Sequence, residues 1–397
     1  MPGRILLANE AGTGRGHLTT LKVFAEALGP DHIYDAALCC LDHAADIAPL
    51  CDLTFQCATL GYQPAAMAVR SGRLIGNWAE FLAAIGFADE DFLTRQIDWW
   101  IRTIQARCSG LVVAEFAPCA MLAAQALGIP VISVGQGHST PPSGMAQFPP
   151  PAPGRALIHD EADLVGIVNR AGARFGLPQL QYFSDVYRCD EQLLRTIPAL
   201  DPYASWRTAP LYLPPLGLNC PAAGAGDEIF VYFSTVEGDD PAILEAIASV
   251  DLPMRVVMPG IEPAFASRLA SRGVAVEQSP LPHQAIAGRS RMIVHAGQHG
   301  ATCLGLALGL PQVALPCQSE QSANAVRVEA MGSLVRFGQP RTDAAAIAAA
   351  IQRVYADTCM AQRARDLAQS LRPALVGDTP ALIRTTVRRV LELTVAA

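Results

Sequence analysis

The chain has 397 residues, more than one ordinary hydrophobic core accommodates, so two domains are expected. A composition of 51% hydrophobic and 16% charged residues is typical of a globular protein and excludes a disordered one. The net charge of −7 and the lack of a dense basic run argue against nucleic acid as a partner.

The eleven cysteines contain no C-x-x-C motif, which argues against a zinc site or a disulfide scaffold. A reducing cytoplasm is therefore the expected compartment. No run of 18 apolar residues occurs, so no membrane span is expected. The apolar run that follows Met1 is too short for a signal peptide and is interrupted at Glu10.

The first half of the chain predicts alternating strands and helices. In order, the pattern indicates a strand over 4–8, a helix over 17–29, a strand over 32–38, a helical region within 52–108, a strand over 110–116, a helix over 119–128 and a strand over 130–135. A β-α-β unit of this kind implies a parallel sheet covered by helices. The Pro- and Gly-rich residues 139–154 are expected to form a long loop.

A second Pro/Gly/Ala stretch, 212–227, predicts the interdomain linker, after which the alternation restarts. The expected elements are strands over 228–234, 254–260, 274–279, 292–295, 312–316 and 333–337, helices over 241–250, 263–273, 283–288, about 300–309 and 322–332, and two closing Ala-rich helices. Two doubly wound domains usually bind ligands in a cleft, at the carboxyl ends of their strands.

The turn "EAGTGRGH", residues 10–17, follows the first strand and opens the first helix. It lacks the third glycine of G-x-G-x-x-G and the Gly-Lys-Ser/Thr of a Walker A loop. It does place His17 at a helix start. An imidazole suits the role of a general base because its ordinary pKa is near neutral pH. Glu115, just past a strand of the same sheet, is the expected orienting carboxylate. The alternatives are that His17 is an exposed cap residue and that Glu115 caps the helix near Pro118.

In the second half, "HAGQHGAT", residues 295–302, links a buried strand to a helix through glycines. A helix start with free N–H groups and nearby glycines predicts a phosphate site. Ser234 and Thr235 end another strand and are further phosphate candidates, or turn residues. Glu320 and Gln321 suit sugar hydroxyls, although Glu and Gln in a first helical turn are also a common capping pattern.

Taken together, these motifs resemble those of the two-domain GT-B glycosyltransferases, specifically bacterial relatives of the macrolide and the UDP-glucuronosyl and flavonoid transferases. The matching stretches run along almost the whole chain: "GRGH", "LVVAEFAPCAMLAAQALGIPVISVGQG", "SPLPHQAI", "HAGQHGAT", "GLALGLPQVALP" and "EQSANAV". The more specific part is the C-terminal set: His295, Gly297, Gly300, Thr302, Pro311, Pro316, Glu320, Gln321 and Asn324.

The resemblance implies two doubly wound, Rossmann-like domains facing a cleft. Residues 1–215 would bind the acceptor, 216–226 would be the linker, 227–380 would bind the nucleotide sugar, and the helix over 381–397 would pack back on the first domain. The implied site residues are His17 and Glu115 for catalysis; Ser234, Thr235, His295, Gly297, Gln298, His299, Gly300, Ala301 and Thr302 for the diphosphate; Leu281, Pro282 and Gln284 for the nucleobase or ribose; Glu320 and Gln321 for the sugar; and Gly16, Trp78 and His138 for the acceptor.

The sequence also departs from the family pattern. The phosphate turn is one residue longer than His-Gly-Gly-x-Gly-Thr, Gly305 lies near where many members carry a ribose-binding glutamate, and the usual Asp-Gln is Glu320-Gln321. The acidic run 89–91 matches D-x-D but precedes an apolar-periodic helix, so it favours a helix start over a metal site. The large aromatic residues between Trp78 and Trp100 are expected mainly in the core.

The expected function is inverting, metal-independent sugar transfer from a UDP- or, less favoured, dTDP-sugar to a small apolar or natural-product acceptor, with His17 as general base and without a bound cofactor. The alternatives are a sugar-nucleotide 2-epimerase and a non-catalytic nucleotide-sugar-binding protein. The partners expected are the donor and the acceptor. The sequence leaves the oligomeric state open, a homodimer being one option.

Overall fold

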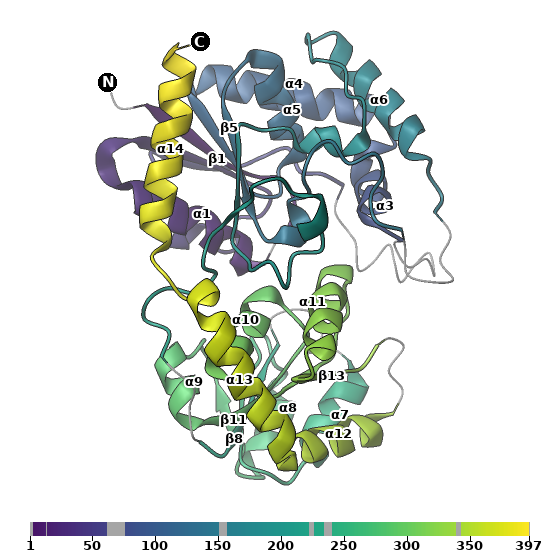
Figure 1. Cartoon of the computed structure of the whole chain (residues 1–397), viewed down its shortest axis with the longest axis vertical. Helices are drawn as coiled ribbons and strands as arrows, with labels where there is room; N and C mark the ends of the chain where they lie inside the picture. Colours follow the sequence, from purple (N-terminus) through teal and green to yellow (C-terminus); the bar gives the residue numbers. More distant parts are fainter. Residues whose placement is uncertain are drawn as a thin grey trace. The chain divides into compact units, whose positions relative to one another are not determined.

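The computed structural model describes residues 3–12, 14–61, 76–150, 157–221, 226–233, 240–338 and 343–396. They divide into two compact units (Figure 1). The first unit comprises Met1–Arg195, Tyr203–Leu213 and Thr379–Ala397. The second comprises Thr196–Pro202 and Pro214–Asp378. Each unit has its own parallel sheet and apolar core, as the two-domain prediction expects.

Within the described residues, the first unit has a seven-stranded parallel sheet of order β3-β2-β1-β4-β5-β6-β7. Its strands are β1 (Arg4–Asn9), β2 (Ile33–Leu38), β3 (Leu53–Gln56), β4 (Leu111–Ala114), β5 (Val131–Gly135), β6 (Glu191–Leu194) and β7 (Leu211–Tyr212). The central strands β4 and β5 are buried along their whole length, which explains why their sequences are apolar except at Ser133.

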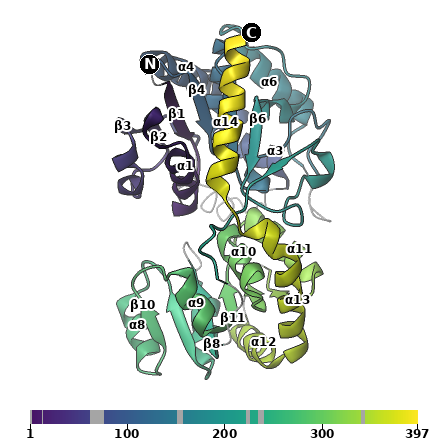
Figure 2. The same cartoon turned by 60° about the vertical axis from the view of Figure 1, so that its left-hand side comes forward.

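Helices cover this sheet. They are α1 (Arg15–Leu28), α3 (Trp78–Leu82), α4 (Glu90–Ala106), α5 (Pro118–Leu127), α6 (Glu161–Ala173) and α14 (Thr379–Ala396). The last helix of the chain, α14, lies beside α1 in both views (Figures 1 and 2). Apolar residues of α14 join the core cluster that includes residues of α1 and β1, so the end of the chain completes the first unit.

Among the described residues, the second unit has a six-stranded parallel sheet of order β10-β9-β8-β11-β12-β13. Its strands are β8 (Glu228–Tyr232), β9 (Met254–Val257), β10 (Ala275–Glu277), β11 (Ser290–His295), β12 (Gln312–Ala314) and β13 (Leu334–Arg336). Its helices are α7 (Pro241–Ser249), α8 (Pro263–Ala270), α9 (His283–Arg289), α10 (His299–Leu308), α11 (Ser319–Ala330), α12 (Ala344–Ala356) and α13 (Thr358–Leu375).

Each sheet has a point where the strand order reverses. In the first unit β1 lies between β2 and β4, and in the second unit β8 lies between β9 and β11. The connections that leave the two central strands at such a point run to opposite faces of the sheet, which leaves a crevice at the carboxyl ends of the strands. This point lies after β1 and β4 in the first sheet and after β8 and β11 in the second.

Several elements differ from the sequence-based expectation. The short strands β3, β6 and β7 and the helix α6 were not anticipated. The helix expected over 381–397 is present as α14, after α12 and α13. The expected linker, 216–226, is partly fixed on the second unit: the Leu216 N–H donates to the Leu375 carbonyl at 3.0 Å, and Arg372 donates to the Pro221 carbonyl at 2.7 Å.

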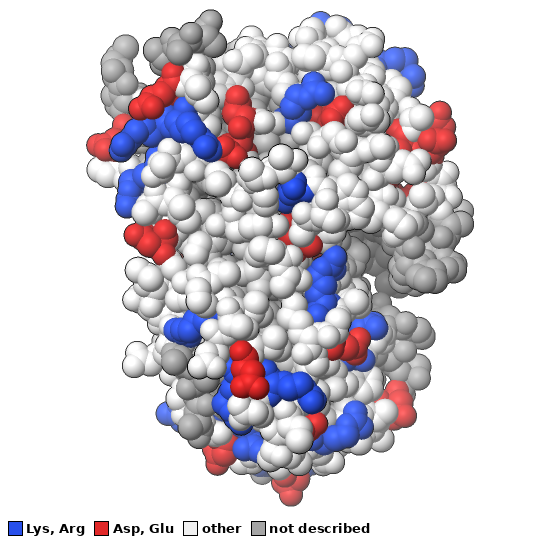
Figure 3. All heavy atoms as spheres, in the orientation of Figure 1, with Lys and Arg blue, Asp and Glu red and all other residues white. Residues whose placement is uncertain are grey.

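None of the helices in the described ranges combines the length and apolar character needed to cross a bilayer. On the face drawn in Figure 3, basic and acidic side chains of the described residues are interspersed among uncharged ones. The expectation that nucleic acid is not a partner remains a prediction.

Candidate active site

Two neighbouring strand ends bring His17 and Glu115 together. β1 and β4 pair in parallel, with Ala8 opposite Ala114, so the chain leaves both strands at the same edge of the sheet. His17 lies in the first turn of α1, and Glu115 directly follows β4. The Nδ1 atom of His17 is 2.9 Å from each carboxylate oxygen of Glu115. The sequence-predicted pair is therefore in direct contact at the carboxyl edge of the first sheet.

The two side chains differ in exposure. The Glu115 side chain is 2% exposed and the His17 side chain is 21% exposed. Because a carboxylate only accepts hydrogen bonds, the shared proton lies on Nδ1, and the lone pair of the neutral ring is on Nε2. An imidazole in this tautomer can accept a proton at Nε2 while the carboxylate stabilises the resulting cation.

Gly12 packs against this nitrogen of the ring. A Cβ atom on Gly12 would lie 2.3 Å from Nε2 of His17, far inside the contact distance. Gly12 also has a φ of +86°, a conformation that side-chain-bearing residues disfavour. The sequence indicated this glycine only as part of an incomplete phosphate-loop pattern. Gly16, an expected acceptor residue, has open space where its Cβ would stand.

Glu10, rather than Glu115, binds the N-terminus of α5. Its carboxylate accepts hydrogen bonds from the backbone N–H groups of Cys119 at 2.8 Å and Ala120 at 3.0 Å. Burial raises the pKa of Glu10 to about 8, against the opposing effect of these N–H groups and the helix dipole. The capping role that the sequence left open for Glu115 is thus filled by another residue, and Glu115 faces His17.

Aromatic side chains adjoin His17. The ring of Phe116 lies 6.2 Å from that of His17 and 5.3 Å from that of Trp78, and the rings of Trp78 and His138 are 5.1 Å apart. Trp78 is 6% exposed and donates its indole N–H to the Tyr187 hydroxyl at 2.8 Å. Phe116 has a φ of +47°, a strained value for a bulky residue, such as often occurs at functional sites. The expected acceptor residues Trp78 and His138 therefore belong to an aromatic wall that reaches His17 through Phe116, in which Trp78 and Phe116 are buried and His138 is half-buried.

In the second unit, a glycine turn leads from β11 into α10. Gln298 is the N-cap residue, and the first helical residue is His299. Gly297 has a φ of +94°, and a Cβ there would lie 2.6 Å from the Gln321 carbonyl oxygen. Asn324 donates its side-chain amide to the Gly297 carbonyl at 3.1 Å. Residues of α11 therefore pack against the turn and hydrogen-bond to it. The N–H groups of the first turn of α10 belong to the helix N-terminus that the sequence predicts as the diphosphate site.

His295 differs from its predicted role. The side chain is fully buried, its Nδ1 accepts the Gly297 N–H at 2.9 Å, and its Nε2 donates to the Gln312 side-chain oxygen at 2.8 Å. Burial lowers the pKa of His295 to about 4, so the ring is neutral. With both ring nitrogens bonded inside the protein, the imidazole supports the turn rather than donating to a ligand. A Cβ on Gly305 would lie 2.6 Å from Gln312, so a glycine there makes room for this partner.

Two other predicted phosphate contacts are also buried. The His299 side chain is 5% exposed, and its Nε2 is 2.8 Å from the Thr196 hydroxyl. The Thr302 side chain is fully buried. The side chains of His299 and Thr302 therefore face the protein interior, whereas Gly300 is exposed, with open space beside its Cα.

The expected sugar-binding residues lie at the start of α11. The side-chain oxygen of Gln321 accepts the N–H groups of Cys317 at 2.7 Å and Gln318 at 3.1 Å, so the capping alternative describes its contacts. Glu320, its neighbour in the same turn, is half-buried. Sugar binding by either residue remains a prediction.

The remaining expected donor residues are at the start of α9 or outside the described residues. Pro282 is the N-cap of α9 and Gln284 is exposed, whereas Leu281 packs partly against the core of the second unit. Ser234 and Thr235 lie outside the described residues.

Within the described part of the chain, no group of three or more His, Cys, Asp or Glu side chains is placed to hold a metal ion. The acidic run 89–91 lies at the start of α4, where Asp89 accepts the Phe92 N–H at 2.9 Å. It acts as a helix cap, as its sequence context favours.

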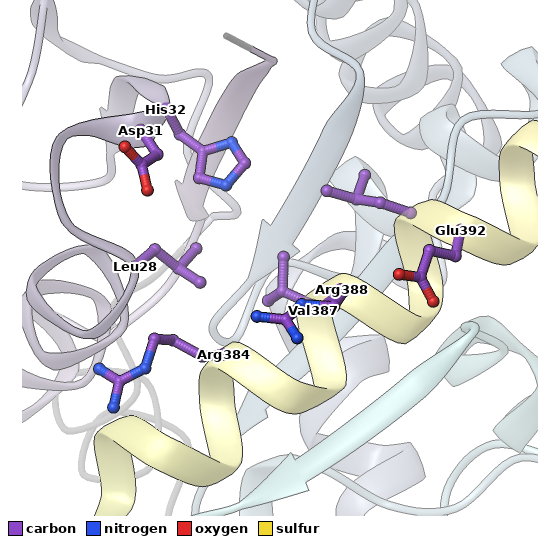
Figure 4. Close-up of a pocket in the computed structure, with 8 residues that line it drawn as sticks. Leu28, Asp31, His32, Arg384, Val387, Arg388 and Glu392 are labelled. Carbon is purple, nitrogen blue, oxygen red and sulfur yellow. The ribbon is translucent and has the colours of Figure 1, made fainter.

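A groove of about 540 Å³ lies elsewhere on the first unit, between α14 and the end of α1 (Figure 4). Its lining residues are Leu28, Asp31, His32, Arg384, Val387, Arg388, Leu391 and Glu392. Arg384 also donates to the Ala27 carbonyl at 3.0 Å. Since α1 has 14 residues and rises about 1.5 Å per residue, the groove and His17 are at opposite ends of the helix.

Comparison with known proteins adds sequence evidence to this geometry. Residues 243–392 match the family model described as erythromycin biosynthesis protein CIII-like, C-terminal domain. A curated relative, the PGL/p-HBAD biosynthesis glycosyltransferase of Mycobacterium tuberculosis, is 31% identical over 138 residues. Those residues are 34% of this chain and 31% of the relative, so the match spans about a third of the relative's length.

Solved glycosyltransferases share the fold over nearly the whole chain. The spinosyn rhamnosyltransferase SpnG has a TM-score of 0.66 at 17% identity and covers 96% of this chain and 99% of its own. The calicheamicin glycosyltransferase CalG4 has a TM-score of 0.67 at 17% identity, with 98% of both chains covered. VinC, solved with dTDP, has a TM-score of 0.66 at 16% identity and covers 99% of this chain and 100% of its own. The GT-B fold that the sequence predicts is confirmed.

Proposed function

We propose that this protein transfers a sugar from a nucleotide-diphosphate sugar to a hydroxyl group of a small natural-product acceptor. The observation that carries this proposal is the contact of 2.9 Å between His17 and Glu115, at the carboxyl edge of a GT-B sheet. An imidazole held by a buried carboxylate suits proton abstraction from a hydroxyl. The match to a macrolide-pathway family and the glycosyltransferase names of the relatives support the same reaction class.

In the proposed reaction, His17 is the general base. Its Nε2 takes the proton of the acceptor hydroxyl as the hydroxyl oxygen bonds to the anomeric carbon. The bond from that carbon to the oxygen of the nucleoside diphosphate breaks, and the nucleoside diphosphate leaves with the electron pair. Attack opposite the leaving group inverts the anomeric configuration. Glu115 stabilises the imidazolium, and general-base catalysis of this kind contributes about 10² to 10⁴ in rate.

The donor is assigned to the second unit. Its diphosphate would bind the first-turn N–H groups of α10, whose partial positive charge also stabilises the leaving group. The exposed Gly300, with open space beside it, suits close approach of phosphate to the backbone. These groups replace a metal cation, so the reaction needs neither metal nor cofactor, and the sugar nucleotide is a co-substrate.

The nucleotide to test first is dTDP. The sequence favours UDP, but SpnG has been solved with thymidine diphosphate and VinC with dTDP. SpnG has also been solved with its spinosyn aglycone. For this chain, the aromatic wall of Trp78, Phe116 and His138 beside His17 supports an apolar acceptor.

The test combines binding with turnover. A ligand that binds only the folded state raises the melting temperature, so dTDP and UDP are compared with thymidine and uridine, which lack phosphates. Diphosphate release from dTDP- and UDP-sugars is then followed with and without a panel of polyketide and phenolic acceptors.

Acceptor-dependent release of the diphosphate, with the sugar recovered on the acceptor, is the expected result. Conversion of the donor sugar without any acceptor would instead identify an epimerase or a hydrolase. Phosphate-dependent binding with no turnover of any donor would identify a nucleotide-sugar-binding protein, and either result would overturn the proposal.

A further inference from the structure

Asn9, the last residue of β1, is fully buried beside the His17–Glu115 pair. Its side-chain nitrogen donates to Oε2 of Glu115 at 3.0 Å and lies 3.2 Å from the Glu115 carbonyl and 2.7 Å from the Ala11 carbonyl. Its side-chain oxygen accepts the thiol of Cys39 at 3.0 Å. Both ends of the amide are therefore engaged, and one of them reaches the carboxylate that binds His17.

The orientation of this amide follows from its partners. The nitrogen end faces three oxygen atoms that only accept hydrogen bonds. The oxygen end faces Cys39, whose pKa burial raises to about 12, so this residue stays a thiol and donates. A flipped amide would place its N–H groups against the thiol and its oxygen against the Glu115 carboxylate, which is unfavourable.

We propose that Asn9 is a positioning residue that fixes the Glu115 carboxylate, and through it the Nδ1–H tautomer of His17. The inference rests on the proposed function, in which His17 is the general base. Without the Asn9 donor, Glu115 gains rotational freedom, and His17 spends part of its time turned away or in the other tautomer. In that tautomer Nε2 carries a proton and cannot accept one.

The neutrality of the amide is part of the role. The ion-pair partner that the structure gives Glu115 is His17. A lysine or arginine at position 9 would also donate to the carboxylate, but its charge would compete with the imidazolium for it. The neutral amide of an asparagine orients the carboxylate, and the negative charge of Glu115 remains available to stabilise the His17 imidazolium.

The test uses the full-length protein and three variants. Asn9→Ala removes the donor. Asn9→Asp keeps the shape but replaces the donor with a second carboxylate against Glu115. Asn169→Ala is the matched control, because the Asn169 amide is likewise engaged at both ends, by the backbone of Leu180, but takes no part in the site.

The first measurement is ¹⁵N NMR of the imidazole at about pH 8.5, well above the ordinary histidine pKa. The His17 signal among the eight histidines is assigned by its loss in His17→Gln. The wild type and Asn169→Ala should show the Nδ1–H tautomer. Asn9→Ala and Asn9→Asp should show a mixture in which the Nε2–H form has grown.

The second measurement is turnover. In Asn9→Ala, kcat should fall about tenfold, which corresponds to about 1.4 kcal/mol, with the donor KM unchanged. Asn9→Asp should be slower still, because two neighbouring carboxylates repel or share a proton. Equal activity of Asn9→Asp and wild type would overturn the inference, since shape alone would then suffice.

An unchanged His17 tautomer in both Asn9 variants would also overturn it. The tautomer measurement does not depend on turnover. Failure of the Asn9 inference is therefore distinguishable from failure of the proposed function, which would be seen as no nucleoside diphosphate release by wild type. If Asn9→Ala does not fold, Cys39→Ala keeps the test decisive. It frees the oxygen end of the amide, removes the 3.4 Å contact of the same thiol with the Gly12 carbonyl, and should shift the tautomer in the same direction by a smaller amount.

Discussion

Replacing Gly12 by alanine puts a methyl group where His17 needs space. The new Cβ would stand 2.3 Å from Nε2 and 2.6 Å from two ring carbons, so the imidazole must turn away and give up its bond to Glu115. Alanine at a φ of +86° adds about 1–2 kcal/mol of backbone strain. The lost bond to the carboxylate adds about 1 kcal/mol, at the low end because the imidazole is partly exposed. The free energy of unfolding should fall by about 2–3 kcal/mol in total.

The effect on catalysis should be larger than this loss of stability suggests. Diphosphate release, measured at saturating donor and well below the melting temperature, should fall about 10²- to 10⁴-fold, as for removal of a general base. Gly176→Ala is the control, because Gly176 has a φ of +75° and no atom within 4 Å of its added Cβ. It should lose stability but keep its rate. Wild-type turnover by folded Gly12→Ala would refute the assignment of Nε2 as the base.

Three further predictions concern the same groups. Glu115→Gln should slow transfer less than loss of His17 does. It should also move the acidic limb of the pH–rate profile to lower pH, because the carboxylate proposed to stabilise the imidazolium is gone. An unmoved limb would count against the pairing of His17 with Glu115. For His295, burial lowers the pKa from 6.5 to about 4, so its contribution to stability is complete above pH 6.5 and is lost as the pH falls towards 4. Denaturant titrations should show up to about 3 kcal/mol of this loss in wild type and less in His295→Gln, and parallel profiles would contradict it. EDTA should leave sugar transfer unchanged and Mg²⁺ should not be required, because in the proposed mode of binding the α10 N–H groups take the place of a metal at the diphosphate. Activity restored only by a divalent cation would exclude this mode of binding.

The fold could be predicted where strands are buried on both faces. β4 and residues 292–294 of β11 are continuous apolar runs, and the residues that follow these strands, Glu115 and the glycine turn, could be placed at a sheet edge. β6 lacks this signal, because it has four residues and begins with the half-buried Glu191 and Gln192. The segment 196–202 belongs to the second unit, although the residues on either side of it belong to the first. Its sequence likewise carries no local signal for this change of unit.

The site could be predicted only as far as residue types at strand ends allow. The contact between His17 and Glu115 follows from two neighbouring strands, and sequence order combined with a β-α-β pattern was sufficient to propose it. The engagement of His295 was not predictable, since its partner Gln312 lies 17 positions later and the choice between ligand and protein contact depends on the packed sheet. The roles of Gly12 and Asn9 depend on atomic distances to other side chains, which local sequence patterns do not contain.

The most direct measurement compares wild type with His17→Ala on a dTDP- or UDP-sugar donor, following diphosphate release and the rise in melting temperature with the free diphosphate. Acceptor-dependent release by wild type is expected, together with a loss of about 10² to 10⁴ in His17→Ala and an unchanged melting-temperature rise in both proteins, because the diphosphate is assigned to the second unit. Undiminished turnover by His17→Ala would contradict the assignment of His17 as the base that drives sugar transfer.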